Sequence, residues 1–271
     1  MMKAPIIALL TDYGDQDFFV ASLKAVILSI QTEAKIVDIS HHVRSFDVRE
    51  GAFLLFGCYK FFPRGTIFVV VVDPGVGTRR RILLVKTKKY YFIAPDNGVL
   101  SYVLDAEKPE RIIGLSEEKV FLAGPGRTFE GRDRMAPAAA WLSQGCSLEE
   151  FGPRLRNYKK FKIPKPMFSK ESVVGHVLYV DHFGNMITNI PSQSIVRLRA
   201  SAKIENPTLR LGTTVITSFR DTYASAKKGE LFFLPGSLAT IEIARREASA
   251  FEVVKAKPGA RVEISFRSEQ T

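Results

Sequence analysis

The chain has 271 residues, of which 46% are hydrophobic and 25% are charged. These fractions are ordinary for a folded globular protein, which argues against intrinsic disorder, and the length suits one large domain or two of average size. The longest apolar stretch, residues 51–72, is interrupted by Lys60 and Arg64, so we expect no membrane-spanning helix.

The formal net charge of +11 raises the question of a nucleic-acid or membrane partner, because clustered lysines and arginines neutralise phosphate groups. The basic residues are scattered in short runs at 79–81, 86–89, 159–165 and 245–246. No single basic helix or aromatic-lined basic groove stands out. The pattern predicts a solvated surface with attraction for small anions, no specific nucleic-acid partner and no membrane partner.

The two cysteines, Cys58 and Cys146, show no metal-ligand spacing, which favours a reducing compartment over a disulfide scaffold. No cleavable signal is evident, because the apolar run 6–10 is short and Asp12 follows closely. We therefore expect a cytoplasmic protein. The four histidines are adjacent or isolated rather than grouped as joint ligands, so no metal site is expected.

The first 157 residues alternate between short apolar runs and amphipathic segments, which predicts an α/β domain with a central, mostly parallel sheet. Strands are predicted at 6–10, 35–39, 66–73, 82–87, 90–94 and 111–115. Helices are predicted at 18–30, 47–61 and 133–144. An aspartate is expected to cap the first helix, and the sequence DVRE resembles a capping box for the second, with Asp47 and Glu50 in the reciprocal positions.

The composition changes after this region. Residues 158–171 are rich in lysine and contain two prolines without an apolar period, which is typical of a linker. Short β-type runs follow at 172–180, 185–189, 213–217, 231–234, 240–243 and 261–266. Their close spacing predicts that residues 172–271 form a smaller β-barrel domain.

Acidic residues follow three of the predicted strands, in the sequences LLTDYGDQD, VVVVDPGVG and FIAPDNG. Ligands of α/β sheets bind beyond the carboxyl ends of the strands, so these side chains are candidates for one site. Helix capping is an equally good interpretation of Asp15 and Asp17. For Asp96, Asn97 and Gly98 we favour a turn.

Asp73 leaves a strand of four valines, where a carboxylate is poorly hydrated unless it is paired. A glycine-containing turn leads to Arg79, Arg80 and Arg81, which can fold back onto it, and a purely structural ion pair is the alternative to a functional one. The sequence GVGTRR also suggests a phosphate cradle, but it lacks the lysine-hydroxyl pair and glycine spacing of the known phosphate loops.

Seven blocks of the chain resemble, in order and spacing, the S-adenosylmethionine hydroxide adenosyltransferases, relatives of the fluorinase and chlorinase enzymes. The blocks are LLTDYGDQDFFVASLKAVI, HHVRSFDVREGAFLL, VVDPGVGTRRR, APDNGVL, TFEGRDRMAPAAAWL, VDHFGNMITNI and LPGSLATIEIA. They extend over nearly the whole chain. The resemblance implies a homotrimer that binds S-adenosylmethionine (SAM) between subunits and needs no cofactor. It also implies that activated water attacks C5′ of the ribose and that methionine and adenosine are released.

The resemblance also implies roles for individual residues. Asp12 matches the acceptor of the ribose hydroxyls, and Phe46 matches an aromatic wall beside the reacting carbon. The methionine end is matched by Asp17, Asp181 and Ser237, and the adenine by Asn185 and Arg245. Without the resemblance, each of these residues also has an ordinary structural interpretation, such as a turn, a core aromatic or a surface cation.

Asp73 and Arg80 match two members of the family's Asp-Arg-His set, which implies that they bind and activate water. In the halogenating relatives an aromatic residue stands at position 73, so an acid there favours water over halide. Where relatives read TFHGRD this chain reads TFEGRD, and Glu130 replaces the histidine. Glu130 either replaces histidine as the proton acceptor, or abolishes turnover and leaves a SAM-binding or adenosine-binding protein, or stands where histidine was never essential because Asp73 suffices. We favour slow hydrolysis with Glu130 in the site. We expect Arg80, Arg127 and Arg132 to offset the repulsion between Glu130 and Asp73.

Overall fold

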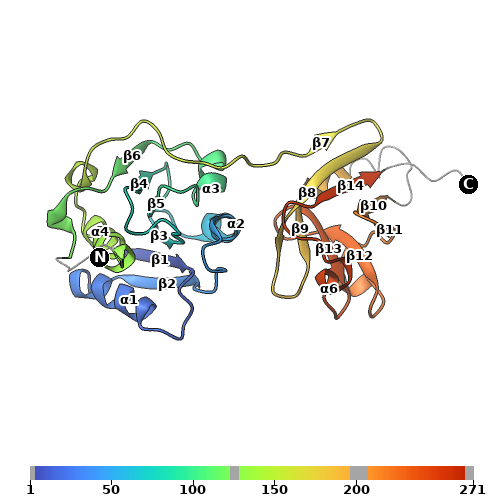
Figure 1. Cartoon of the computed structure of the whole chain (residues 1–271), viewed down its shortest axis with the longest axis horizontal. Helices are drawn as coiled ribbons and strands as arrows, with labels where there is room; N and C mark the ends of the chain where they lie inside the picture. The colour runs from blue at the N-terminus through green and yellow to red at the C-terminus, as the bar shows by residue number, and fades with distance from the viewer. Residues whose placement is uncertain (1–3, 123–127, 196–206, 266–271) are drawn as a thin grey trace, which may run out of the picture. The chain divides into compact units, whose positions relative to one another are not determined.

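The computed structural model describes residues 4–122, 128–195 and 207–265. The chain divides into two compact units, Met1–Lys162 and Ile163–Thr271 (Figure 1). This division falls within the segment 158–171, which the sequence predicts to be a linker.

The N-terminal unit is built on a six-stranded sheet with the order β2-β1-β3-β5-β4-β6. The strands are β1 (Ile6–Thr11), β2 (Lys35–Ser40), β3 (Ile67–Val71), β4 (Ile82–Lys86), β5 (Tyr91–Pro95) and β6 (Arg111–Gly114). Neighbouring strands from β2 to β5 are parallel, whereas β4 is antiparallel to both β5 and β6. The predicted α/β class is confirmed.

The antiparallel strand β4 departs from the strict strand-helix alternation. β4 and β5 form a hairpin in which Lys86 pairs with Tyr91 and the Thr87 N–H donates to the Tyr90 carbonyl oxygen at 2.9 Å. Such a short connection cannot contain a crossover helix, so the two strands must run in opposite directions.

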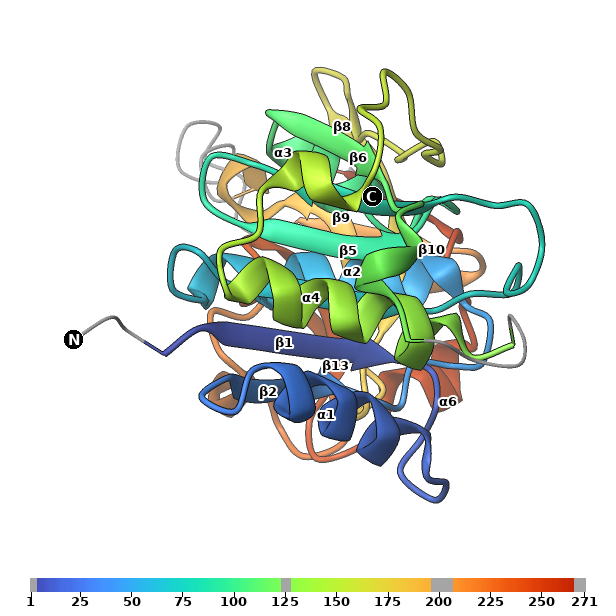
Figure 2. The ribbon, with the colours of Figure 1, turned by 90° about the vertical axis from the view of Figure 1, so that its left-hand side faces the viewer.

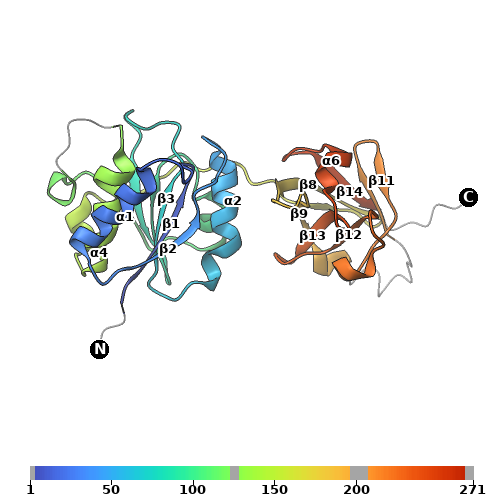
Figure 3. The same ribbon diagram turned by 90° about the horizontal axis from the view of Figure 1, so that it is seen from below.

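Helices cover both faces of the sheet. On one face α1 (Phe19–Ile30) and α4 (Ala136–Ser143) pack over Leu9, Val69 and Val71 (Figures 2 and 3). On the other face α2 (Val48–Cys58) and α3 (Ser101–Ala106) pack over side chains of the same strands that point the opposite way. All five residues of β3 are buried, as expected of a central strand that is covered on both sides. The short α3 has no capping side chain and was not predicted.

The capping predictions have mixed outcomes. Asp47 does cap α2, because its Oδ1 accepts from the backbone N–H groups of Arg49 and Glu50 at 3.1 and 3.0 Å. The reciprocal half of the capping box is wrong, since Glu50 pairs with Arg44 instead. The predicted aspartate cap of α1 is also wrong. The N-cap is Phe18, without a side-chain hydrogen bond, and Asp17 lies one residue too early and is exposed.

The third predicted helix consists of two segments. The π-helical turn η3 (Gly131–Met135) precedes α4 (Ala136–Ser143), and the 3₁₀ turn η1 (Tyr59–Phe61) likewise extends α2. A π turn inserts an extra residue into the helix and is common at functional sites. Here it begins directly after Glu130.

The C-terminal unit is an eight-stranded, nearly closed antiparallel barrel, which confirms the predicted second domain type. The sheet order is β11-β10-β14-β8-β9-β13-β12, and β7 pairs with β8. The strands are β7 (Met167–Phe168), β8 (Ser172–Val180), β9 (Met186–Pro191), β10 (Thr208–Leu211), β11 (Thr214–Ile216), β12 (Leu231–Pro235), β13 (Thr240–Arg245) and β14 (Arg261–Ser265). A short helix, α6 (Ala250–Val254), follows β13. Strand β10 was not predicted, and Phe266, the predicted end of the last strand, lies outside the described residues.

The segment predicted as a linker is partly ordered by hydrogen bonds. The Lys159 N–H donates to Asp96 Oδ1 at 2.6 Å and the Phe161 N–H donates to Ser101 Oγ at 3.1 Å, both within the N-terminal unit. Further along, Asn189 Nδ2 donates to the carbonyl oxygen of Pro164 at 2.8 Å, within the C-terminal unit. With β7 also inside it, this segment is not the wholly irregular linker that its composition suggests.

Candidate active site

Two acidic residues leave the sheet at the same edge. Thr11 and Val71 are register partners at the ends of the parallel strands β1 and β3, so Asp12 and Asp73 emerge beside each other. Both line a cavity of about 420 Å³, here called the first cavity. Its lining residues are Asp12, Tyr13, Phe19, Ser45, Phe46, Val71, Asp73, Val76, Thr128, Phe129 and Gly131.

Asp73 is held by the turn that follows it. Its Oδ1 accepts from the Gly75 N–H at 3.1 Å, and Arg80 Nε donates to its Oδ2 at 2.6 Å. The predicted fold-back of an arginine onto Asp73 is therefore confirmed for Arg80. Arg81 turns to Asp96 instead, with an Nε–Oδ2 distance of 2.9 Å.

Arg80 bridges Asp73 to Glu130, since its Nη2 contacts a carboxylate oxygen of each. The three side chains are almost completely buried, with exposed fractions of 4%, 6% and 1% for Asp73, Arg80 and Glu130. Asp73 lines the first cavity, whereas Arg80 and Glu130 are not part of its lining. The guanidinium of Arg80 thus lies between two carboxylates, and of the three side chains only Asp73 lines the cavity.

A second cation lies near Glu130. Arg134 Nε is 3.5 Å from Glu130 Oε1, one helical turn along η3. The expected partner Arg132 pairs with Asp133 at 2.7 Å, so it does not offset the charge of Glu130 in the predicted way, and Arg127 lies outside the described residues. Burial alone would lower the pKa of Arg80, but the hydrogen bond and charge of Asp73, and then Glu130, raise it above its ordinary value. Arg80 is therefore a permanent cation.

Arg80 also keeps a spare donor. Its Nη1 is buried and makes no hydrogen bond with the described residues. A buried guanidinium N–H without a partner is costly, so this atom is suited to donate to an ordered water or to a ligand.

Asp12 is connected to the predicted aromatic wall. Its Oδ2 accepts from the Phe46 N–H at 2.8 Å. Phe46 has φ +68°, a left-handed conformation that is rare for a bulky residue, and its side chain is 69% exposed. Such strain concentrates at functional sites. Burial, opposed by the Phe46 hydrogen bond and assisted by the charge of Asp73, raises the pKa of Asp12.

Two other groups of acidic residues do not line the first cavity. Asp17 is exposed in the turn before α1 and is not among the residues that line the first cavity. Asp96 pairs with Arg81, and Asn97 Nδ2 donates to the carbonyl oxygen of Val72 at 2.8 Å, which supports the turn interpretation of this segment. Asp15 Oδ2 lies 3.5 Å from His42 Nε2, and no side-chain hydrogen bond caps α1, whose N-cap is Phe18.

Four of the predicted binding residues lie together in the C-terminal unit. Asp181, Asn185, Ser237 and Arg245 line a second cavity of about 700 Å³. Asn185 donates to Asp181 through its backbone N–H at 2.8 Å and through Nδ2 at 3.0 Å. Arg245 Nε donates to the Gly229 carbonyl oxygen at 3.0 Å. Each residue thus has a structural contact as well as access to the cavity.

Glu242 is a polar lining residue that the sequence interpretation missed. It is buried, its Oε2 accepts from the Tyr223 hydroxyl at 2.6 Å, and its Oε1 accepts from the Ser237 N–H at 3.2 Å. The signal was present in the sequence TIEIAR, where a single glutamate stands between two buried isoleucines. Tyr13, Phe129 and Gly131 of the first cavity were also missed as site residues, although they lie in the blocks LLTDYGDQD and TFEGRD.

Comparison with protein families decides the affiliation. Residues 7–152 match the model of the SAM hydroxide adenosyltransferase N-terminal domain, and residues 175–263 match that of the C-terminal domain. The chain belongs to the SAM hydroxide adenosyltransferase family. The resemblance inferred from the seven sequence blocks is therefore confirmed.

Several proteins resemble the chain over most of its length. A protein named (R)-S-adenosyl-L-methionine hydrolase from Thermus thermophilus is 32% identical and covers 94% of this chain and 97% of its own. One of the same name from Salinispora tropica is 30% identical, with 98% and 99% covered. A protein named fluorinase from Actinoplanes is 33% identical, with 69% and 72% covered. A crystal structure of an uncharacterized conserved protein from Thermotoga maritima is 38% identical with a TM-score of 0.90, and it covers 96% of this chain and 99% of its own.

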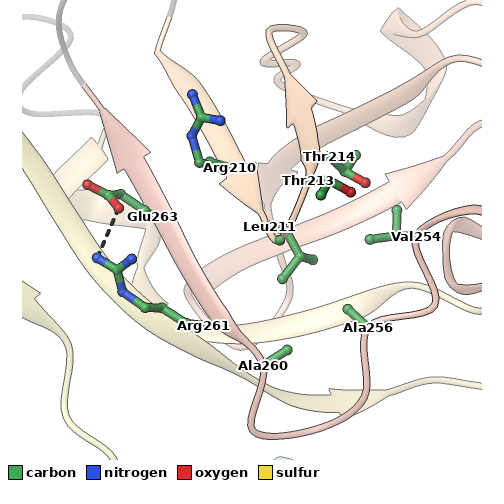
Figure 4. A pocket seen from close by; sticks show the side chains of 10 residues that line it. Arg210, Leu211, Thr213, Thr214, Val254, Ala256, Ala260, Arg261 and Glu263 are labelled. Atoms are coloured by element: carbon green, nitrogen blue, oxygen red, sulfur yellow. Dashed lines mark ion pairs between the residues drawn. The ribbon is translucent and has the colours of Figure 1, made fainter.

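A third cavity, of about 430 Å³, lies apart from the residues that match the family's site. It is formed by the turn between β10 and β11, the segment after α6 and the start of β14 (Figure 4). Its floor is apolar, with Leu211, Ala256 and Ala260, and Arg261 at its rim pairs with Glu263 at 2.9 Å. Arg210 and Arg261 are exposed, so we assign no ligand to this cavity.

The remaining sequence expectations concern metals, cysteines and membranes. No group of three or more potential metal ligands occurs among residues 4–122, 128–195 and 207–265. Cys58 and Cys146 are free thiols, and burial raises the pKa of Cys58 to about 11. Within the part of the chain that the structure describes, no helix is both long and apolar enough to cross a membrane.

Proposed function

We propose that this protein hydrolyses S-adenosyl-L-methionine to adenosine and L-methionine. The observation that carries the proposal is the position of the Asp73 carboxylate. Asp73 lines the first cavity, and Arg80, which does not line it, donates a hydrogen bond to the carboxylate. A fixed carboxylate in a cavity wall can orient a water molecule and take its proton. The names of the relatives support the same substrate.

The proposed reaction needs only a nucleophile and a proton acceptor. The water oxygen forms a bond to C5′ of the ribose, the C5′–S bond breaks, and its electron pair stays on the sulfur of methionine. One water proton becomes the adenosine hydroxyl proton and the other passes to Asp73 and then to solvent. A sulfonium is already a good leaving group, so no general acid, metal or cofactor is proposed.

We propose water rather than halide as the nucleophile. A halide in the first cavity would lie beside the carboxylate oxygens of Asp73, and repulsion between two anions is weakly screened in a partly buried site. Water, in contrast, can donate a hydrogen bond to the same oxygen. The fluorinase relatives show that the family includes halide chemistry, and the acid at position 73 argues against it here.

Glu130 is proposed to act through Arg80. Its carboxylate lies behind the guanidinium rather than in the cavity lining, so it is a positioning residue and not the group that accepts the proton from water. Arg80 lies between the two carboxylates and contacts both. Of the three interpretations of Glu130, this geometry supports turnover with Asp73 as the acceptor.

The substrate contacts are proposed from the positions that match the family. Asp12 would accept hydrogen bonds from both ribose hydroxyls, and Phe46 would lie beside C5′. Asp181 would face the methionine ammonium and Ser237 its carboxylate, while Asn185 and Arg245 would contact the adenine. Asp17 is also assigned to the methionine end, although it is exposed at the turn before α1.

The assembly and location remain part of the proposal. The family resemblance suggests a homotrimer with substrate sites at the subunit interfaces and a cytoplasmic location. The scattered basic residues suggest that the protein has no nucleic-acid partner. The exposed side chains of Phe46 and Phe183 at the rims of the first and second cavities favour burial of these rims in an assembly.

The decisive experiment is a product assay in H₂¹⁸O. Purified protein is incubated with S-adenosyl-L-methionine, and adenosine and methionine are quantified, with the Asp73→Asn variant as control. We expect equal amounts of both products and ¹⁸O in the 5′-hydroxyl of adenosine. A parallel incubation with chloride or fluoride should yield no 5′-halogenated nucleoside, and its appearance would contradict the proposed nucleophile.

A protein that binds SAM or adenosine without turnover is the second candidate. The replacement of the family's histidine by Glu130 is the observation that favours it. Three results together would establish this alternative. Calorimetry would show tight binding of SAM, the wild type would form no adenosine, and Glu130→His would form adenosine. A salt-dependent shift of oligonucleotides would support nucleic-acid binding instead.

A further inference from the structure

Tyr13 lines the first cavity, and the reaction described so far has no use for its hydroxyl group. Tyr13 directly follows Asp12 and lines the cavity together with Asp12 and Asp73. Its ring packs against Phe19 and Phe129, with centroid distances of 5.5 and 5.7 Å. The ring is therefore held in place by two other aromatic lining residues.

The position of the hydroxyl explains the glycine at 131. A Cβ atom built on Gly131 would lie 2.6 Å from the Tyr13 hydroxyl oxygen, 3.6 Å from Tyr13 Cζ and 3.3 Å from Val71 Cγ1. The phenol oxygen thus fills the space that any side chain at 131 would need. The Tyr13 oxygen therefore lies against Gly131, the residue after Glu130. It is also close to Val71, at the end of the strand β3 that precedes Asp73.

The surrounding charges determine which role the hydroxyl can take. Burial, and then the negative charges of Asp12 and Asp73, raise the pKa of Tyr13, while Arg80 lowers it. The phenol consequently stays protonated through the neutral range. It has one O–H to donate, in a cavity whose other polar side chains include two carboxylates that can only accept.

We propose that the Tyr13 hydroxyl donates a hydrogen bond to the attacking water and, with Asp73, defines its position. This inference rests on the proposed hydrolysis. The water would donate one hydrogen to Asp73, accept the Tyr13 hydrogen on one lone pair, and direct the other lone pair at C5′. As the new O–C5′ bond forms and the C5′–S bond breaks, the proton goes to Asp73, while Tyr13 keeps its own. Tyr13 is then a catalytic residue that the family's Asp-Arg-His set does not include.

The variant Tyr13→Phe tests this role, because it keeps the ring and its aromatic contacts and removes only the oxygen. We expect kcat to fall about tenfold or more while KM changes less than about twofold, since the lost bond is made to the nucleophile and not to SAM. Tyr102→Phe is the matched control: Tyr102 lies in α3, also has a raised pKa caused by burial, and is not among the first-cavity residues. It should turn over like the wild type.

If Tyr13 has only a structural role, Tyr13→Phe should have the kcat of the wild type. With an active wild type, this result would overturn the role of Tyr13 and leave the proposed hydrolysis intact. A wild type that forms no adenosine would contradict both the proposed function and this inference.

The stability of two further variants tests the position of the Tyr13 hydroxyl independently of activity. Gly131→Ala should lower the melting temperature by roughly 4 °C, and most of this loss should be recovered in the double variant Gly131→Ala/Tyr13→Phe. The same loss in both backgrounds would show that the hydroxyl does not lie over residue 131.

Discussion

Arg80 lies between the carboxylates of Asp73 and Glu130, and only Asp73 reaches the cavity. At the residue scale this arrangement separates two tasks. In the proposed reaction Asp73 contacts the nucleophile, while Arg80, which also contacts Glu130, holds the Asp73 carboxylate in position. Removing each group should therefore affect different measurable quantities.

Asp73→Asn should lower the chemical step much more than substrate binding. Asparagine keeps the size and one acceptor oxygen but cannot take a proton, so we expect kcat to fall about a hundredfold or more with little change in the SAM dissociation constant. Single-turnover kinetics and calorimetry measure the two quantities. Unchanged turnover would eliminate Asp73 as a catalytic residue.

Glu130→Gln should reduce turnover without abolishing substrate binding, because Arg80 loses one of its two buried anions. The same change should lower the free energy of unfolding by about 1–3 kcal/mol, since a buried charge pair is broken while a hydrogen bond is kept. Glu130→His should preserve or increase turnover. An inactive His variant beside an active wild type would show that this chain depends on the glutamate.

Asp12→Ala should chiefly weaken binding, because hydrogen bonds to the ribose hydroxyls exist in the ground state and in the transition state alike. We expect KM to rise about tenfold or more at nearly constant kcat. A large loss of turnover at saturating SAM with unchanged affinity would contradict this role.

Asp12→Asn should separate stability from function. Because the folded-state pKa of Asp12 is raised, the stability gained from its proton is present at low pH and is lost as the pH rises through that value. The asparagine variant does not titrate and still accepts from Phe46. Its melting temperature should equal that of the wild type below about pH 4 and exceed it slightly at neutral pH. A lower melting temperature at pH 7 would show that the ionised carboxylate stabilises the fold.

At the scale of elements, strand ends and close contacts place the side chains. β1 and β3 end in register, the π turn η3 presents Glu130, and β8 approaches β9 at a glycine. A Cβ on Gly175 would lie 2.4 Å from both Asn189 Oδ1 and Ile190 Cγ1. Asn189 also receives the His176 N–H at 2.7 Å and donates to Pro164, so it joins the segment before β7 to the barrel.

Gly175→Ala should therefore destabilise the barrel by about 1–3 kcal/mol through overpacking. Urea unfolding of the full chain measures the change. Gly75→Ala is a suitable comparison, because a Cβ there would meet its nearest neighbours at 3.5 Å, an ordinary contact distance, and its stability should change by less than about 1 kcal/mol. Equal losses in the two variants would contradict the close packing at Gly175.

At the scale of the whole molecule, each unit has its own core and its own cavity. If the protein is a homotrimer, as proposed, light scattering after gel filtration should give three times the chain mass of 30.3 kDa. The charged variant Phe46→Glu should shift this mass downward, and Phe61→Glu, at a phenylalanine that is 83% exposed and outside the first cavity, should not. A monomeric wild type would refute the assembly.

Local patterns in the sequence determined much of this protein. The buried strand before Asp73, the Asp47 cap and the change to β-type runs after residue 171 are properties of neighbouring residues, and each is present in the structure. The seven sequence blocks likewise identified the family before the cavities were known. The failures were also local, since Asp17 lies one position too early to cap α1 and Glu50 pairs with Arg44 instead of completing a capping box.

Tertiary structure decided how Glu130 joins the predicted pair of Asp73 and Arg80. Arg80 and Glu130 are 50 residues apart, and nothing in their local sequences shows that the guanidinium lies between two carboxylates, or that Glu130 stands behind it and not in the cavity. In the same way, only the packed structure brings the Tyr13 hydroxyl over Gly131. The physical reason is that periodicity and capping depend on a residue's neighbours along the chain, whereas the energy of a buried charge or hydroxyl depends on partners that only folding brings within reach.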